Sequence, residues 1–292
     1  MTALNADNLT DVAADSFAGL PDARQRLLVQ TLVRHLHAYA AEVRLTHAEW
    51  RGALGFLHRV GEMSSATRSE FSLLSDVLGL SSLVDLLASD PDATPGSVLG
   101  PFHTVGSPWI DNPANLIGAN AGAPVLLRGR VCDTQGRPLP QATLDFWQNA
   151  ANGLYWQTDP AQPTDNLRCQ LKVADDGSFE IATIQPMPYQ IPTDGPVWLE
   201  LVEPAGRGSW RAAHFHLIVS APGHRTLVTE LFEADDPYLE SDAVFGVRDA
   251  LIGRFETVTD AAACARFGLP GEQCRVMQVE LRLAPLAESE KP

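Results

Sequence analysis

The sequence is short of positive charge, and that shortage narrows its partners. It carries 36 Asp and Glu residues against 21 Lys and Arg residues, a formal net charge of −15. A phosphate-binding face needs clustered Lys and Arg, so we expect no nucleic-acid partner and no anionic membrane surface. The chain also lacks any apolar run near the roughly 20 residues of a membrane span. Residues 1–17 lack the basic and apolar segments of a signal peptide, and we expect a cytoplasmic protein.

Cysteine is also scarce, and its spacing excludes two common kinds of site. The four cysteines form no C-x-x-C pair and no dense framework; they are Cys132, Cys169, Cys264 and Cys274. This pattern favours reduced thiols over disulfides or a cysteine-ligated zinc.

The sequence pattern changes near residue 90 from apolar residues at helical spacing to short β-like segments, which predicts two domains. Apolar residues recur at helical spacing from Asp22 to Val43, and Thr46 to Glu49 has the pattern of a capping box that opens a second helix. Two shorter helices are expected before residue 90, whereas residues 1–20 are expected to form a loose lead-in. We predict a helical domain over residues 1–95 and a second domain over residues 96–292.

The second domain has the pattern of a β protein. Short apolar segments, among them residues 142–147, 197–202, 214–219 and 226–232, are separated by turn signals such as Asp175-Asp176-Gly177. Strands at this spacing predict an antiparallel β-sandwich rather than alternating strands and helices. The fold class is therefore mainly β, with an α-helical N-terminal unit.

One β-like stretch contains two histidines separated by a single residue. Successive side chains of a strand point to opposite faces, so His214 and His216 project from the same face. Two imidazoles in this arrangement supply half of a metal site. By itself, the pattern is equally consistent with two histidines on a solvated strand.

Tyrosine is rare as well, and two of the four tyrosines lie in unusual local sequences. Tyr155 follows Asn152-Gly153-Leu154, just after a predicted strand. Tyr189 lies within Pro186-Met187-Pro188-Tyr189-Gln190-Ile191-Pro192, where prolines restrict the backbone on both sides. The alternative interpretation is a pair of buried tyrosines with hydrogen-bonded hydroxyls.

Taken in order along the chain, these residues resemble the intradiol ring-cleavage dioxygenases. The resemblance covers nearly the whole sequence and includes the helical N-terminal part, Val98 to Phe102, and Leu127 to Val131. Its most specific elements are Pro-x-Pro-Tyr-x-x-Pro around Tyr189 and Arg-x-Ala-His-x-His from Arg211 to His216.

The resemblance implies one Fe(III) ion held by four side chains: Tyr155, Tyr189, His214 and His216. Two phenolates and two imidazoles suit Fe(III) better than zinc or calcium. The family further implies that Tyr189 is the labile axial ligand, which leaves and accepts a proton when an aromatic diol binds. O2 would then cleave the bond between the two hydroxylated ring carbons. Arg211 would place a fixed positive charge beside the charge that develops on the ring.

Two further stretches, residues 71–79 and 236–247, resemble the hydroxyquinol (benzene-1,2,4-triol) branch of the family. The product would be 3-hydroxy-cis,cis-muconate or its tautomer maleylacetate. By resemblance, the pocket would be lined by Leu73, Asp76, Val98, Leu99, Gly100 and Val244. In this pocket Asp76 could accept a hydrogen bond from the third ring hydroxyl.

Glu230 departs from the family pattern. The family usually has Gln or His at this position, and a carboxylate there disfavours an anionic diolate unless it is protonated or turned outward. Catechol, chlorocatechol and chlorinated hydroxyquinol therefore stay open as alternative substrates.

A transthyretin-like β-sandwich binding module without catalysis is the alternative from another class. An Fe(II) extradiol enzyme would instead use two histidines and a carboxylate. The family resemblance also implies a homodimer joined through the helical domain, with bound lipid.

Overall fold

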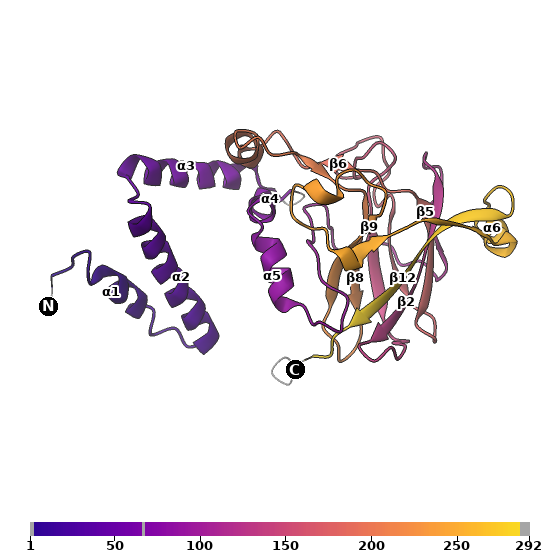
Figure 1. Cartoon of the computed structure of the whole chain (residues 1–292), viewed down its shortest axis with the longest axis horizontal. Coiled ribbons are helices and arrows are strands. Elements are labelled where there is room, and N and C mark those ends of the chain that lie inside the picture. Colours follow the sequence, from indigo (N-terminus) through magenta and orange to yellow (C-terminus); the bar gives the residue numbers. More distant parts are fainter. Residues whose placement is uncertain (1–2, 66–67, 287–292) are drawn as a thin grey trace. The chain divides into compact units, whose positions relative to one another are not determined.

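The computed structural model describes residues 3–65 and 68–286 (Figure 1). The chain forms two compact units, Met1–Arg59 and Val60–Pro292. The predicted domain division between residues 95 and 96 stays a prediction. By their contacts, the helices between residues 70 and 88 belong to the second unit.

The first unit is helical, as the apolar spacing predicts. It contains α1 (Leu9–Asp15), α2 (Ala23–Glu42) and most of α3 (His47–Met63). The Asp22 carboxylate caps α2 by accepting the Gln25 N–H, and Thr46 and Glu49 form the predicted capping box of α3. The expectation of a loose lead-in is wrong, because α1 packs along α2, where Gln30 donates a hydrogen bond to the Ala14 carbonyl.

Two short helices begin the second unit: α4 (Glu70–Val77) and α5 (Leu80–Ala88). They are separated by Gly79, whose φ of +73° is a left-handed conformation that suits glycine. Within the described residues, no single helix combines the length and apolarity that crossing a membrane requires. Only α4 and α5 taken together, with a bend of 73° between them, meet that test, and they do so by length and composition alone.

Two five-stranded sheets form the framework of the second unit (Figure 1). The first has the order β1-β5-β2-β12-β11 and the second β10-β9-β8-β3-β4, while β6 and β7 form a separate pair. The bounds of the first sheet are β1 (Ala114–Asn115), β2 (Pro124–Asp133), β5 (Ser178–Ile184), β11 (Glu256–Thr259) and β12 (Gln273–Leu283). Those of the second are β3 (Thr143–Trp147), β4 (Arg168–Lys172), β8 (His214–Ser220), β9 (Leu227–Glu233) and β10 (Ile252–Gly253). The pair consists of β6 (Tyr189–Gln190) and β7 (Trp210–Arg211).

The predicted mainly β fold with an N-terminal helical unit is confirmed, but the sheets are mixed rather than purely antiparallel. The longest ladder, from Val276↔Leu126 to Leu283↔Asp133, joins β12 and β2 in parallel. Parallel neighbours need a long connection. Here the whole second sheet lies between β2 and β12 in the chain, so the last strand can return in either direction.

One predicted strand is helical. Residues Trp198–Val202 form a single π-helical turn after Asp194-Gly195-Pro196. The Glu70 carboxylate accepts a hydrogen bond from the backbone N–H of Val197 and fixes the start of this turn. A short apolar run does not distinguish a strand from a helical turn by periodicity.

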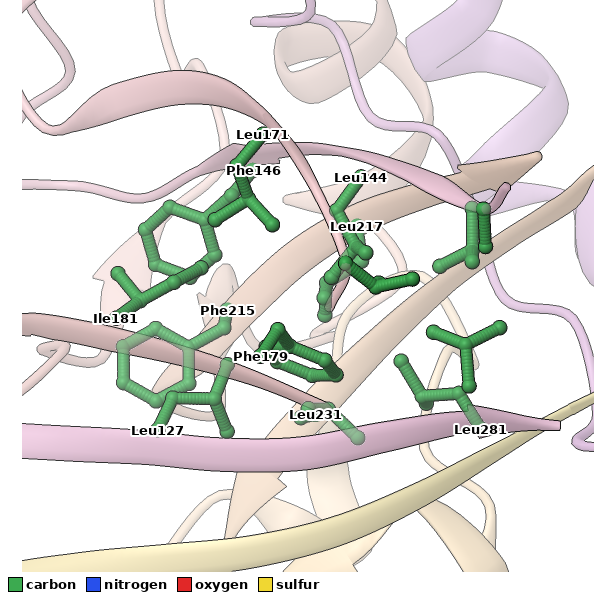
Figure 2. Close-up of a cluster of buried hydrophobic side chains, with 14 of the residues drawn as sticks. Leu127, Leu144, Phe146, Leu171, Phe179, Ile181, Phe215, Leu217, Leu231 and Leu281 are labelled. Atoms are coloured by element: carbon green, nitrogen blue, oxygen red, sulfur yellow. The ribbon is translucent and has the colours of Figure 1, made fainter. Parts of the chain in front are cut away.

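The core lies between the two sheets. Figure 2 shows side chains from β2, β5 and β12 meeting those from β3, β4, β8 and β9. Phe146 and Phe215 have ring centroids 5.4 Å apart, and both side chains are fully buried. Because Phe215 lies between His214 and His216 in sequence, β8 supplies the core with one face and the site with the other.

We predict that Gly129→Ala destabilises the protein by about 1–3 kcal/mol, the usual cost of overpacking a core. A methyl group on Gly129 in β2 would overlap the ring of Phe179 on the paired strand and lie 2.8 Å from Val279 Cγ2. The free energy of unfolding in urea measures the loss. Gly208→Ala is the matched control, because a methyl group there meets nothing within 4 Å; equal effects of both substitutions would contradict the packing argument.

Candidate metal centre

The strand register of the second sheet places the two histidines beside side chains that restrict their orientation. His214 and His216 lie on β8 and are both buried. Trp147 on β3 is paired with His216, and the two rings stack with centroids 4.7 Å apart and planes 4° from parallel. The indole therefore fixes the plane of the His216 imidazole, and the interpretation of two solvated histidines is wrong.

The hydrogen bonds of His214 leave one ring nitrogen as an acceptor. Its Nδ1 lies 2.6 Å from the carbonyl oxygen of Ala212, so Nδ1 carries the proton and donates it. The Nε2 atoms of His214 and His216 lie 3.1 Å apart. Burial lowers the pKa of both imidazoles well below the usual value, which keeps them neutral. Neutral imidazoles whose nitrogens converge are suited to hold a cation.

Both predicted tyrosines border this pair. Tyr189 lies on β6, directly opposite Arg211 on β7, and its ring centroid is 5.6 Å from that of His214. Tyr155 has its ring centroid 5.4 Å from Tyr189 and 6.2 Å from His216. Phe102 stacks on Tyr155 at 4.5 Å and fixes its orientation. The structure thus brings together all four side chains that the family resemblance assigns to the metal.

The tyrosine hydroxyls test whether a metal fits here. Both are buried, and each faces the other tyrosine or Arg211 without completing a hydrogen bond among the described residues. Burial raises the pKa of Tyr155 well above its usual value and raises that of Tyr189, despite the nearby Arg211 charge. A buried hydroxyl without a partner is costly. A cation that bound both oxygens would remove that cost, so the donor set fits a metal ion.

Arg211 is buried. Its Nε donates to Asp242 Oδ1 at 3.0 Å, and its Nη1 and Nη2 donate to Glu230 Oε1 and Oε2 at 2.7 and 2.9 Å. Nη1 also lies 3.3 Å from His214 Nε2, and Nη2 lies 3.5 Å from Asp242 Oδ2. Although burial opposes the charge, the two carboxylates raise the pKa of Arg211 well above its usual value.

Glu230 points into this site. It lies on β9 opposite His216, is fully buried, and accepts a 2.7 Å hydrogen bond from Ser97 Oγ in addition to those from Arg211. Burial is the largest single cause and acts to raise its pKa, but the charge of Arg211 and the hydrogen bonds from Arg211 and Ser97 together lower the pKa below its usual value. Glu230 is therefore an ionised carboxylate directed inward.

Ligand atoms of His214, His216 and Glu230 lie within 4.8 Å of one another, a spacing that could hold a metal ion. Two histidines and one carboxylate are also typical of Fe(II) sites. Both Glu230 oxygens, however, already accept hydrogen bonds from Arg211, and Oε2 accepts a third from Ser97. The tyrosine hydroxyls have no such partners and are the more available oxygen donors.

The predicted pocket residues fall into three groups. Leu73 and Asp76 are buried one turn apart on α4, and the charges of Arg211 and Glu230 act on Asp76. A Cβ on Gly100 would lie 3.1 Å from His216 Cε1, so this backbone adjoins the histidine pair. Residues 98 and 244 are likewise buried valines.

Leu99 differs from the other predicted pocket residues. It lies between Val98 and Gly100, but its side chain is 42% exposed. Its place in the pocket stays a prediction.

Sequence analysis missed several residues of the site. Asp242 binds Arg211 and accepts the Gly246 N–H at 2.7 Å, and Ser97 lies within hydrogen-bond distance of both Glu230 and the Gly246 carbonyl. No motif marks these residues, because they meet only in the folded chain. Gly246 is a special case, since a Cβ there would lie 2.7 Å from Arg211 Nη2.

A cavity of about 520 Å³ opens beside the two tyrosines. Its lining includes Tyr155, Tyr189, Ile191 and Pro192, and Arg68 also borders it. The first four present mainly apolar and aromatic surface, which suits a flat ring. From sequence, the stretch Gln190-Ile191-Pro192 indicates only a rigid setting for Tyr189, and nothing in it marks Ile191 or Pro192 as pocket residues.

Comparison with known families gives two matches that together span most of the chain. Residues 22–96 match the family described as "Catechol dioxygenase N terminus". Residues 100–285 match the family described as "Dioxygenase".

Individual proteins are similar over nearly their full length. The chain is 44% identical over 255 residues to a 6-chlorohydroxyquinol 1,2-dioxygenase of Cupriavidus pinatubonensis, covering 87% of this chain and 92% of that protein. It is 41% identical over 253 residues to a hydroxyquinol 1,2-dioxygenase of Nocardioides simplex, covering 85% of each. The crystal structure of hydroxyquinol 1,2-dioxygenase from Pseudomonas putida DLL-E4 superposes with a TM-score of 0.83 at 42% identity, covering 96% of this chain and 99% of that one.

We predict that acid destabilises the metal-free protein through His214 and His216. Their pKa values are lowered on folding, so the unfolded chain binds protons that the folded chain does not. Their contribution is fully present above about pH 6.5 and is lost as the pH falls below it. Between pH 7.5 and 5.5 the two groups together should cost roughly 2–3 kcal/mol of unfolding free energy.

Urea unfolding at both pH values measures this loss, and an H214Q/H216Q double variant supplies the comparison. The variant should lose less stability than the wild type over the same interval. Equal losses would show that the two histidines do not remain neutral in the folded protein.

Proposed function

Because the chain belongs to the intradiol ring-cleaving dioxygenases, we propose that it cleaves hydroxyquinol with O2 to 3-hydroxy-cis,cis-muconate or its tautomer maleylacetate. Because the chain is a member of this family, it is a dioxygenase, and the alternative of a binding module without catalysis is excluded. The observation that carries the proposal is the grouping of two buried tyrosines, whose hydroxyls have no hydrogen-bond partner among the described residues, around a pair of neutral imidazoles. The similarity to hydroxyquinol and 6-chlorohydroxyquinol 1,2-dioxygenases supports the substrate.

The family implies a non-haem Fe(III) ion, and we propose that Tyr155, Tyr189, His214 and His216 hold it. When bound, the ion draws electron density from the two ring oxygens of the substrate and makes the ring reactive toward O2. Trp147 and Phe102 keep the His216 and Tyr155 rings in place, so two of the four donors are preorganised by stacking.

We propose that Tyr189 accepts a proton from the substrate. Its hydroxyl makes no hydrogen bond among the described residues, and its side chain borders the cavity beside Ile191. The raised pKa of this phenol favours its protonated form once it is free of a cation. A proton taken from a ring hydroxyl would therefore remain on the Tyr189 oxygen while the diol stays ionised.

We propose that Asp76 recognises the third hydroxyl of the ring. Its carboxylate is buried on α4 and lies within the influence of Arg211. Burial is the main cause that raises the pKa of Asp76. A hydrogen bond from a ring hydroxyl would compensate that burial.

We also propose that a second copy of the chain covers the apolar surface of its helices. Described helical residues with large exposed apolar side chains include Leu28, Leu32, Leu36, Leu83 and Leu87. Exposed apolar patches of this kind mark interaction surfaces. The family resemblance supplies the partner, a homodimer with bound lipid.

The visible spectrum tests the proposed metal ligands. We expect the iron-loaded protein to show a broad tyrosinate-to-iron band, which shifts to longer wavelength with hydroxyquinol under anaerobic conditions and bleaches when O2 is admitted. Tyr155→Phe and Tyr189→Phe should each weaken the band, whereas Tyr238→Phe, outside the site, should leave it unchanged. A colourless protein that nevertheless binds one iron per chain would contradict tyrosine ligation.

Asp76→Asn tests the substrate. We expect the ratio of kcat/KM for hydroxyquinol to that for catechol to fall about tenfold, because a hydrogen bond to a carboxylate is stronger than one to an amide. Catechol lacks the third hydroxyl and should be less affected. The control is Asp249→Asn, at an exposed carboxylate. An unchanged ratio in Asp76→Asn would remove Asp76 from substrate recognition.

A further inference from the structure

Every N–H group of Arg211 faces a polar partner in the structure, and four of the five face carboxylate oxygens of the protein. A guanidinium has five N–H donors, and the structure gives Arg211 five polar contacts: two with Glu230, two with Asp242 and one with His214. An arginine with free N–H groups can bind a ligand carboxylate in bidentate geometry. Here both of its edges are already occupied by carboxylates of the protein.

The charge around Arg211 is negative rather than positive. One guanidinium faces two fully engaged carboxylates, Glu230 and Asp242, and both are buried. Ser97 stabilises this arrangement by hydrogen bonding at Glu230 Oε2, and the Gly246 N–H does so at Asp242 Oδ2. In a buried site, a surplus charge acts over several ångströms with little screening.

The cavity beside the tyrosines is also lined by an arginine that is paired with carboxylates of the protein. Of the residues that line it in the described part of the chain, Arg68 is the one cation. Arg68 binds Asp194 through Nη1 and Nη2 at 2.9 and 2.8 Å, and it binds Glu70 through Nη2 at 2.9 Å. Two arginines near the tyrosines are therefore each paired with two carboxylates of the protein, which compensate their charge.

We propose that Glu230 is a specificity-determining residue: by neutralising Arg211 together with Asp242, it excludes aromatic diols that carry a carboxylate and admits rings whose other substituents are uncharged. This inference rests on the proposed function, because it assumes that a diol binds beside His214 and His216. It narrows the substrate class to diols whose other ring substituents carry no charge. It also changes the predicted role of Arg211, whose charge is largely compensated before any substrate binds.

A matched pair of ligands tests the proposal. 3,4-Dihydroxybenzoate and 3,4-dihydroxybenzamide have the same shape and the same two ring hydroxyls, and they differ by one negative charge. Each is titrated anaerobically into the iron-loaded full-length protein, and its Kd is read from the visible band and from calorimetry. The quantity that matters is the ratio of the two Kd values, because a general disturbance of the pocket affects both ligands and cancels.

We expect the wild type to bind the amide more tightly than the acid. Glu230→Gln keeps the shape and removes one negative charge, so the ratio should fall by about tenfold, equivalent to about 1.4 kcal/mol. Glu233→Gln is the control, made in the same strand on the opposite face, where Glu233 contacts Gln185 and Arg275. That variant should leave the ratio within about twofold of the wild type.

Asp242→Asn provides a second test if Glu230→Gln fails to fold or to load iron, and it should lower the ratio in the same direction. A ratio unchanged in the folded variant would overturn the proposal, as would a wild type that binds the acid as tightly as the amide. These results differ from failure of the proposed function, in which neither ligand shifts the visible band of the wild type.

Discussion

The buried ion pair between Arg211 and Glu230, with Asp242 as the second carboxylate, is the interaction on which the site depends. Removing one partner of a buried pair typically costs about 3–5 kcal/mol, because a charge is left uncompensated. Glu230 comes from β9 and Asp242 from the following loop, while Ser97 adds the segment that leads to Gly100. One polar cluster thus fixes three segments around the histidines, two of which carry predicted pocket residues.

The register of the strands brings the residues of this cluster together. A slip of one residue would turn every side chain of the strand to the other face of the sheet. His216 is opposite both Trp147 and Glu230, and Tyr189 is opposite Arg211. The large core on the other face of β8 resists such a slip, because Phe215 and Leu217 would then leave it. The stability of the sandwich and the geometry of the site are therefore two consequences of the same register.

The parts of the site that sequence could predict are those whose geometry is local. The spacing of His214 and His216 is enough to place both on one face of a strand, and the prolines around Tyr189 mark a constrained backbone. Family resemblance supplied Tyr155 and the metal. By contrast, the contact between Arg211 and Asp242 spans 31 positions and depends on a loop conformation that no short-range pattern encodes. Neither the π-helical turn at Trp198–Val202 nor the parallel pairing of β12 with β2 was predicted, for a related reason. A short apolar run does not distinguish a strand from a helical turn, and it does not indicate with which strand it pairs or in which direction.

Glu230 shows how one substitution can change what a familiar motif means. Judged from sequence, a carboxylate beside an anionic diol had to be protonated or turned outward. The structure has a third arrangement, in which the carboxylate is ionised, points inward and is matched to Arg211. The free-energy cost of burying the Glu230 charge is thus compensated by Arg211 and not by a ligand. Ligand binding is affected all the same, because an arginine that already binds two carboxylates binds a third, from a ligand, only weakly.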